Sequence, residues 1–354
     1  MNVPVTDPFG VSRDPAMPFL AAALDPREAE RRLARAGAAG RVRLGAIRVT
    51  RYKPGRRCLI EYDLEVEQPG GACSPVTWVG KARAKGLDLF SCQLLGSLRG
   101  AGFGAESTDG TSVPEPVGVI AEWQMWLQHK VPGVAATQLL AEPGGVALAR
   151  RIAEAAHKLH RAGIAPRRRH TMADELRILH ERLPALARER PHWARRLERL
   201  LDACDRLGAA TAPGAFRGVH RDFYADHVLV DGPRLYLLDF DLYCEGDPGL
   251  DIGNFLGHLT EQSLRTLGGP DAMADREGAL EERFVELAGA GVRAAVRAYA
   301  LLTLVRHVAL STQLPERRPF TATLLEVCEQ RLCRYAKGTP ALEDRATGRA
   351  ATAT

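Results

Sequence analysis

The interpretation of this chain starts from GVHRDFYADHVLV, residues 218–230, in which a polar loop runs directly into an apolar strand. Asp222 stands in the loop, where a carboxylate can accept the proton of an attacking hydroxyl group. By itself the match is weak, because His, Arg and Asp before a strand are more often solvated or capping groups. A few residues later LYLLDFD, residues 235–241, delivers Asp239 at a strand end. A carboxylate there suits a magnesium ion, although Asp is also common at ordinary strand-to-loop junctions.

A third segment, GDPGLDIGN at residues 246–254, follows these two in order. The conjunction resembles the aminoglycoside phosphotransferase and choline kinase family. Its pattern is His-x-Asp, an Asn five residues after that Asp, an apolar strand ending in Asp, and an Asp-Pro-x-x-Asp segment. The matching positions here are His220, Asp222, Asp239, Asp247, Pro248 and Asp251.

The resemblance implies an α+β, bilobal protein-kinase-like fold with an N-terminal antiparallel sheet lobe and a larger, mainly helical C-terminal lobe. It implies that Asp222 is the catalytic base, in a catalytic loop shared with His220 and Arg221. Asp239 would be the main magnesium ligand, and Asp251 would support the loop. The implied cofactors are ATP and Mg²⁺.

Two positions depart from the family pattern. His227 stands where the family has the Asn that serves as second metal ligand. A neutral imidazole can bind a metal, but it suits softer ions better than magnesium. In the helix of the first lobe, Gln93 takes the place of the Glu that pairs with the lysine of the third strand. A neutral amide could hydrogen-bond that lysine without forming an ion pair.

The expected first lobe is a sheet with one helix against it. Alternating and β-branched residues predict strands over 44–53, 58–67 and 75–84, joined as an antiparallel meander, a helix over 87–100 and strands over 117–121 and 123–130. By resemblance Lys81, on the third strand, would contact the α- and β-phosphates. The alternative is an exposed edge charge.

Two further segments of this lobe are candidate nucleotide contacts. The turn over 51–57, with Lys53 and Gly55, could cover the phosphates with backbone amides and positive charge. It lacks GxGxxG, and a basic surface hairpin is an equal alternative. The segment 122–130 resembles the adenine-binding hinge, with Gln128, His129 and Lys130 as contacts through the backbone. Trp123 and Trp126 are expected to be packing residues.

The domain organisation follows from changes in period. We expect an N-terminal extension over 1–43, a nucleotide-binding lobe and hinge over 44–130, a catalytic and substrate lobe over 131–337, and a disordered tail over 338–354. Within the extension, residues 1–25 are expected to be loosely ordered, and Asp25 caps a short helix over 26–36. His157, His160 and His170 lack metal-ligand spacing and are expected to be structural or on the surface.

Composition excludes several classes of protein. The 354 residues suffice for two cores, and the net charge of +5 is spread along the chain. Aromatic residues make up only 6%, which argues against a nucleic-acid binder. Seven cysteines without a CxxC pair argue against a disulfide scaffold. No secretory signal is apparent, and the apolar stretch 294–310 is expected to be too short to span a bilayer. We therefore expect a cytoplasmic protein without membrane or nucleic-acid partners.

Three functions remain to be weighed. The first is transfer of the γ-phosphate of ATP to a hydroxyl of a small molecule of aminoglycoside, sugar, choline or amino-alcohol type. The second, motivated by His227 and Gln93, is a nucleotide-binding pseudokinase with a regulatory or scaffold role. The third, a protein kinase, is disfavoured because no activation segment with an Ala-Pro-Glu-like end is present. The acceptor and the oligomeric state stay open.

Overall fold

The computed structural model describes residues 3–37, 41–67 and 71–338. The chain divides into two compact units, the first made of residues 1–133 with 230–238 and the second of residues 134–229 with 239–354. The sequence predicts the boundary between the two lobes near Val131. It does not predict that residues 230–238 belong to the first unit. The tail predicted over 338–354 lies, apart from Gly338, outside the described residues.

The first unit is built on the antiparallel meander predicted from the alternating sequence. Strands β2 (Val42–Lys53), β3 (Arg57–Glu67) and β4 (Cys73–Arg83) pair in succession. In β3 the fully buried Cys58, Ile60 and Tyr62 alternate with partly exposed residues, as one buried face requires. The sheet continues through β7 (Met125–His129) to β6 (Pro116–Ile120), and β1 (Val5–Thr6) joins its other edge in parallel with β2.

The expectation that residues 1–25 are loosely ordered is wrong for their described part. They form β1, the 3-10 turn Val11–Arg13 and α1 (Leu20–Ala23). Val11, Met17 and Leu20 are fully buried in the core of the first unit, so hydrophobic burial orders this segment although it has no period of its own.

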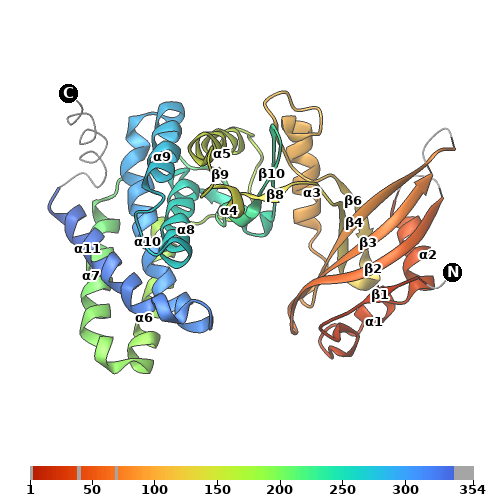
Figure 1. The fold of residues 1–354 in the computed structure, drawn as a ribbon, viewed down its shortest axis with the longest axis horizontal. Coiled ribbons are helices and arrows are strands. Elements are labelled where there is room, and N and C mark those ends of the chain that lie inside the picture. Colours follow the sequence, from red (N-terminus) through yellow and green to blue (C-terminus); the bar gives the residue numbers. More distant parts are fainter. Residues whose placement is uncertain (1–2, 38–40, 68–70, 339–354) are drawn as a thin grey trace. The chain divides into compact units, whose positions relative to one another are not determined.

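Two helices of the first unit begin at acidic caps. Helix α2 (Pro26–Ala36) begins as predicted, because the Asp25 carboxylate accepts a hydrogen bond from the Glu28 amide, and α2 packs against β2 (Figure 1). Helix α3 (Leu89–Leu98) begins at Asp88, whose carboxylate accepts from the Ser91 amide. Strand β5 (Thr111–Ser112) pairs in parallel with β11 (Arg234–Leu237).

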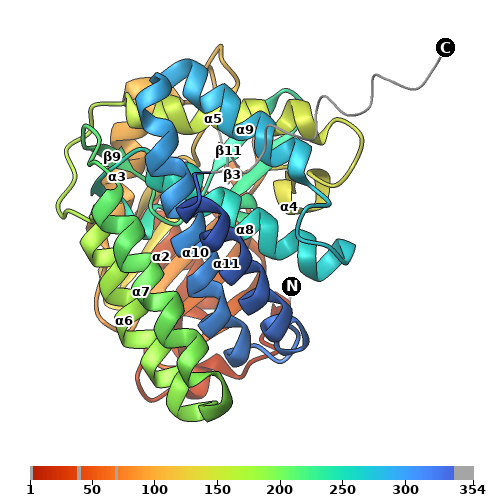
Figure 2. The same cartoon turned by 90° about the vertical axis from the view of Figure 1, so that its left-hand side faces the viewer.

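The second unit is mainly helical. Its longer helices are α5 (Gly145–His160), α6 (Met172–Glu189), α7 (Ala194–Ala210), α8 (Gly249–Leu267), α9 (Ala274–Ala288), α10 (Arg293–Gln313) and α11 (Thr321–Ala336). Shorter elements are β8 (Val134–Ala135), α4 (Ala136–Leu139), β9 (Arg217–Val219) and β12 (Cys244–Gly246), and the boundary between the units falls within β10 (Val228–Asp231). Helices α6, α7, α10 and α11 pack side by side around a leucine-rich core (Figure 2). Strand β9, which leads into the candidate catalytic loop, pairs antiparallel with β12, and the sequence predicted neither strand.

Helix α8 is buried on nearly all sides and approaches α10 closely along three glycines. A Cβ on Gly253 would lie 2.5 Å from Tyr299 Cβ and 2.7 Å from the Ala300 nitrogen, and Gly249 and Gly257 face α10 in the same way. Of the described helices, the segment Ala290–Gln313 is long and apolar enough to cross a membrane by length and composition, so the expectation that the stretch 294–310 is too short is wrong. However, 72% of its most apolar window is buried inside the structure, as in the core helix of a globular protein.

Candidate active site

The candidate catalytic loop, residues 220–227, is fastened by one buried carboxylate. Asp251, in the first turn of α8, is fully buried and accepts hydrogen bonds from the backbone amides of His220 at 2.8 Å and Arg221 at 2.6 Å. His160 Nε2, at the end of α5, lies 2.8 Å from Asp251 Oδ2 and donates to it. The sequence anticipated Asp251 as the support of the loop, but not His160, which it left as a structural or surface residue.

The same face of α8 continues along the loop. Asn254 Nδ2 donates to the Phe223 carbonyl at 3.0 Å, and the His258 ring stacks on Tyr224 with centroids 4.4 Å apart. One turn further along α8, Gln262 Nε2 donates a hydrogen bond to the Thr137 carbonyl at 2.8 Å. These positions recur at intervals of three and four residues, which places them on one side of a helix. That spacing after the Asp-Pro-x-x-Asp segment was the signal that could have identified them from the sequence.

The backbone of the candidate site adopts a sparsely populated conformation at two positions. In the described residues three non-glycine residues have positive φ, and two of them are Arg221 at 71° and Asp239 at 61°. Such conformations cost about 1–3 kcal/mol each and persist where surrounding contacts determine them. At Arg221 the contact is the bond from its amide to Asp251. Strain of this kind concentrates at functional sites.

Asp222, His227 and Asp239 lie close to one another in the second unit. The Asp222 side chain is 39% exposed, whereas that of Asp239 is 17% exposed and that of His227 only 7%. His227 Nδ1 lies 2.8 Å from the Asp222 carbonyl oxygen and 3.8 Å from its carboxylate. His227 Nε2 lies 3.6 Å from Asp239 Oδ2. Burial lowers the pKa of His227 below its ordinary value, against the opposing effect of the two carboxylates, and so favours the neutral ring.

This arrangement fits a divalent cation. Because the Asp222 carbonyl can only accept, the proton of the neutral His227 ring is on Nδ1 and the lone pair is on Nε2, toward Asp239. The 3.6 Å between Nε2 and the carboxylate oxygen is shorter than twice a metal-ligand bond of about 2.1 Å, so one ion can contact both atoms. Within the described residues no three His, Cys, Asp or Glu side chains gather as a metal cluster.

Among the first-unit candidates, Lys81 occupies an interior position of the sheet. It lies on β4, opposite Leu59 of β3 and Trp126 of β7, so the alternative of an exposed edge charge is wrong. Its ammonium nitrogen is 5.1 Å from the centroid of the Trp126 ring. Trp123 and Trp126 are both buried, as predicted. Gln93 is exposed on α3.

The turn between β2 and β3 is held by a residue that the sequence did not single out. Gly55, at φ 61°, donates its amide to Asp14 Oδ2 at 2.8 Å, and the Tyr52 hydroxyl donates to the same oxygen at 2.7 Å. These bonds lower the pKa of the Asp14 carboxyl, the Gly55 amide most. The Gly55 amide is thus engaged by Asp14. Lys53 is exposed at the end of β2, opposite Arg57.

The predicted hinge contacts also have partners within the first unit. The amide of His129 donates to the Glu115 carbonyl and that of Lys130 to the Thr77 carbonyl, each at 2.8 Å. The Lys130 ammonium pairs with Glu61, and Gln128 is buried on β7. The backbone N–H groups of His129 and Lys130 are therefore already engaged within the first unit.

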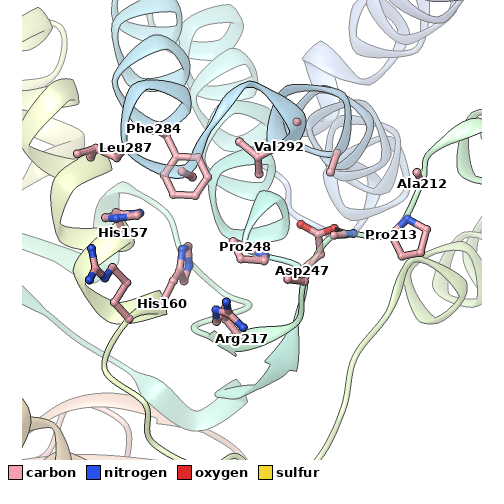
Figure 3. Close-up of a pocket in the computed structure, with 16 residues that line it drawn as sticks. His157, His160, Ala212, Pro213, Arg217, Asp247, Pro248, Phe284, Leu287 and Val292 are labelled. Atoms are coloured by element: carbon pink, nitrogen blue, oxygen red, sulfur yellow. Dashed lines mark hydrogen bonds between the residues drawn. The ribbon is translucent and has the colours of Figure 1, made fainter.

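A separate pocket of about 530 Å³ lies in the second unit (Figure 3). Residues of α5, α9 and the segment before β9 line it, together with Asp247 and Pro248. His157 lies there with its ring edge against Phe284, and His160 lines the same pocket. None of Asp222, His227 and Asp239 belongs to the lining, so this pocket is distinct from the candidate site and shares with its supports only His160.

The sequence model of the phosphotransferase enzyme family matches residues 93–307, more than half of the chain. The chain belongs to this family. The phosphotransferase match includes the candidate catalytic loop, Asp239 and Asp251, and it begins after Lys81 and the turn at Gly55. No curated protein sequence matches the chain.

Solved phosphotransferase structures share the fold. A spectinomycin phosphotransferase in complex with ADP and spectinomycin is 10% identical, with a TM-score of 0.54 over 86% of this chain and 98% of the other. A thermostable mutant of aminoglycoside phosphotransferase APH(4)-Ia with AMP-PNP and hygromycin B is 16% identical, with 0.54 over 86% and 97%. A choline/ethanolamine kinase family protein from Mesorhizobium loti is 15% identical, with 0.53 over 86% and 94%. The fold is therefore α+β and protein-kinase-like, as the sequence implied.

Proposed function

We propose that this phosphotransferase moves the γ-phosphate of ATP to a hydroxyl group of a small molecule, with Asp222 as the catalytic base. The observation that carries the proposal is the grouping of Asp222, His227 and Asp239 beside a loop whose amides are held by Asp251. Phosphoryl transfer depends mainly on positioning and on electrostatic stabilisation, and a rigid loop with a half-exposed carboxylate meets the first need.

In this mechanism Asp222 orients the acceptor hydroxyl and takes up its proton. Asp239 and His227 would hold a divalent cation, which would neutralise charge on the phosphates. The Asp222 carbonyl keeps the His227 ring in place, so the base and the metal ligand are positioned by the same short loop. Lys81 of the first unit is the proposed contact of the α- and β-phosphates, and Lys53, with the backbone of the hinge, contributes to nucleotide binding.

The acceptor class is proposed more broadly than any single substrate. The similar structures include proteins described as phosphotransferases of spectinomycin and aminoglycosides and a member of the choline/ethanolamine kinase family. An amino sugar, a sugar or an amino alcohol would each supply the hydroxyl that the mechanism needs. Specificity among them depends on side chains outside the catalytic loop.

The test is metal-dependent ATP turnover against a panel of such acceptors, comparing the wild type with Asp222→Asn. Loss of the base should lower kcat by about 10²- to 10⁴-fold while ATP affinity stays the same, because the substitution keeps the shape of the side chain. His180→Asn, on an exposed side chain that pairs with Asp205, is the matched control and should retain full activity. Activity that survives Asp222→Asn would contradict the proposed role.

The second candidate function is a nucleotide-binding pseudokinase with a regulatory or scaffold role. It is favoured by His227 in the place of the expected Asn and by Gln93 in the place of the expected Glu. This alternative predicts that ATP raises the melting temperature of the protein without turnover on any acceptor. Retention of Asp222 and Lys81 together favours the enzyme, because a binding module has no use for the base.

A further inference from the structure

The side chain of His227 is fixed in position by the residues around it. Its Nδ1 donates to the Asp222 carbonyl at 2.8 Å. The Tyr224 ring centroid lies 4.3 Å from that of His227, and the His220 ring stacks on His227 with centroids 5.8 Å apart. With 7% of the side chain exposed, the ring has little room to turn away. The contacts of the loop therefore fix the direction in which His227 Nε2 points.

That direction leads to the Asp239 carboxylate. The separation of 3.6 Å between His227 Nε2 and Asp239 Oδ2 is longer than a hydrogen bond and short enough for both atoms to bind one ion. The pair thus presents one nitrogen and one oxygen. An Asn at position 227, as in the family pattern, would present an amide oxygen, and the ligand pair would be oxygen only.

Divalent ions respond differently to that exchange. Magnesium is a hard ion that takes oxygen ligands and keeps its waters, whereas first-row transition ions accept imidazole nitrogen, with affinity rising from Mn²⁺ towards Co²⁺ and beyond. Mn²⁺ also accepts carboxylate and phosphate oxygens, so it can replace Mg²⁺ on a nucleotide. A nitrogen ligand should therefore shift the preference of the site without removing its ability to bind a metal–nucleotide complex.

We propose that His227 makes the nucleotide-associated metal site of this chain selective for transition ions such as Mn²⁺ and Co²⁺ over Mg²⁺. The inference rests on the proposed function, because it concerns the same metal site. It assigns to His227 the role of a specificity-determining ligand in which Asp239 supplies the oxygen and the Asp222 carbonyl sets the orientation of the ring.

The experiment uses the full chain with the non-hydrolysable analogue AMP-PNP and no acceptor. Loss of the electron paramagnetic resonance signal of free Mn²⁺ gives the affinity for Mn²⁺, and displacement by Mg²⁺ or Co²⁺ gives the preferences. In the wild type the affinity for Mn²⁺ should exceed that for Mg²⁺, and His227→Asn should lower the ratio by about ten- to a hundredfold. His180→Asn should leave the ratio unchanged, since that side chain is exposed and pairs with Asp205.

A second measurement gives its main result on the wild-type protein, so it does not require that a variant folds. The electron spin echo of Mn²⁺ bound with AMP-PNP to the wild type should show the modulation of a coordinated ¹⁴N from imidazole, and His227→Gln or His227→Asn should lose it. Bound nucleotide and metal without ¹⁴N modulation, or with the same metal preference in wild type and His227→Asn, would overturn this inference and leave the proposed function standing. Failure of AMP-PNP to bind with any of the three ions would overturn both.

Discussion

Two loops of this chain, one in each unit, are held in shape by a single carboxylate from a distant part of the sequence. Asp14 holds the β2–β3 turn through the amide of Gly55, 41 residues away, and the hydroxyl of Tyr52. Asp251 holds the candidate catalytic loop through the amides of His220 and Arg221, about 30 residues away. Both loops are held in the same way, by a carboxylate that accepts hydrogen bonds from backbone N–H groups.

The difference lies in what stands behind each carboxylate. Asp251 is fully buried in the first turn of a 19-residue helix that packs along α10, and His160 fastens it from a third element. Asp14 directly follows a three-residue 3-10 turn and lies in no long helix or strand, with 7% of its surface exposed. A loop anchored to a long helix that is packed on several sides should open only when the core opens, whereas a turn anchored to a short segment can open locally. The catalytic loop should thus be the more rigid of the two.

The largest effect is expected from Asp251→Ala. It would leave two loop amides and the N–H of His160 without their acceptor in a buried site, which costs about 3–5 kcal/mol of the free energy of unfolding. Urea denaturation measures the loss, and phosphotransfer should disappear in whatever fraction stays folded. Asp251→Asn, which keeps an acceptor oxygen, should lose less. A change below about 1 kcal/mol for Asp251→Ala would remove the distinction between the two anchors.

A smaller loss of stability is expected when the helix that carries Asp251 is displaced. Gly253→Ala places a Cβ 2.5 Å from Tyr299 Cβ and 2.7 Å from a backbone nitrogen of α10, so the helices must separate at a cost of about 1–3 kcal/mol. Gly278→Ala in α9 is the control, because an added Cβ there meets nothing within 4 Å and should stabilise the helix by up to about 1 kcal/mol. Equal melting temperatures for the two variants would show that α8 and α10 are not tightly packed at Gly253.

Asp14→Asn is expected to change the overall stability least and to act mainly on the β2–β3 turn. Protection of the Gly55 amide against hydrogen exchange should fall by roughly tenfold or more, while the melting temperature changes little. Because hydrogen bonds lower the pKa of Asp14, the stabilisation of the turn is fully present above the ordinary value of 3.8 and is lost as pH falls through the lowered pKa. Gly55 protection in the wild type should decrease over that range and stay flat in Asp14→Asn. A large drop in melting temperature would instead make Asp14 a global anchor like Asp251.

Local features of both units could be predicted from the sequence. Strands 42–53 and 57–67 alternate because one face of each is buried, and such a pattern can be recognised without knowing the partner strand. Asp25 was identified as a cap because a cap bonds an amide only three residues ahead. The family and its protein-kinase-like fold could be inferred in the same way from short motifs. The roles of Asp222, His227 and Asp239 stay predictions.

Only the tertiary structure decided which distant groups meet. Residues 1–25 have no period, yet Val11, Met17 and Leu20 complete the core of the first unit because the sheet offers them an apolar face. Asp14 reaches Gly55 across 41 residues, and His160 reaches Asp251 across 91. Local propensity carries no information about such pairs, since their bonds form only after both elements have been placed by packing. What the sequence determined was therefore the chemistry of the loops, and what the fold determined was how firmly each one is held.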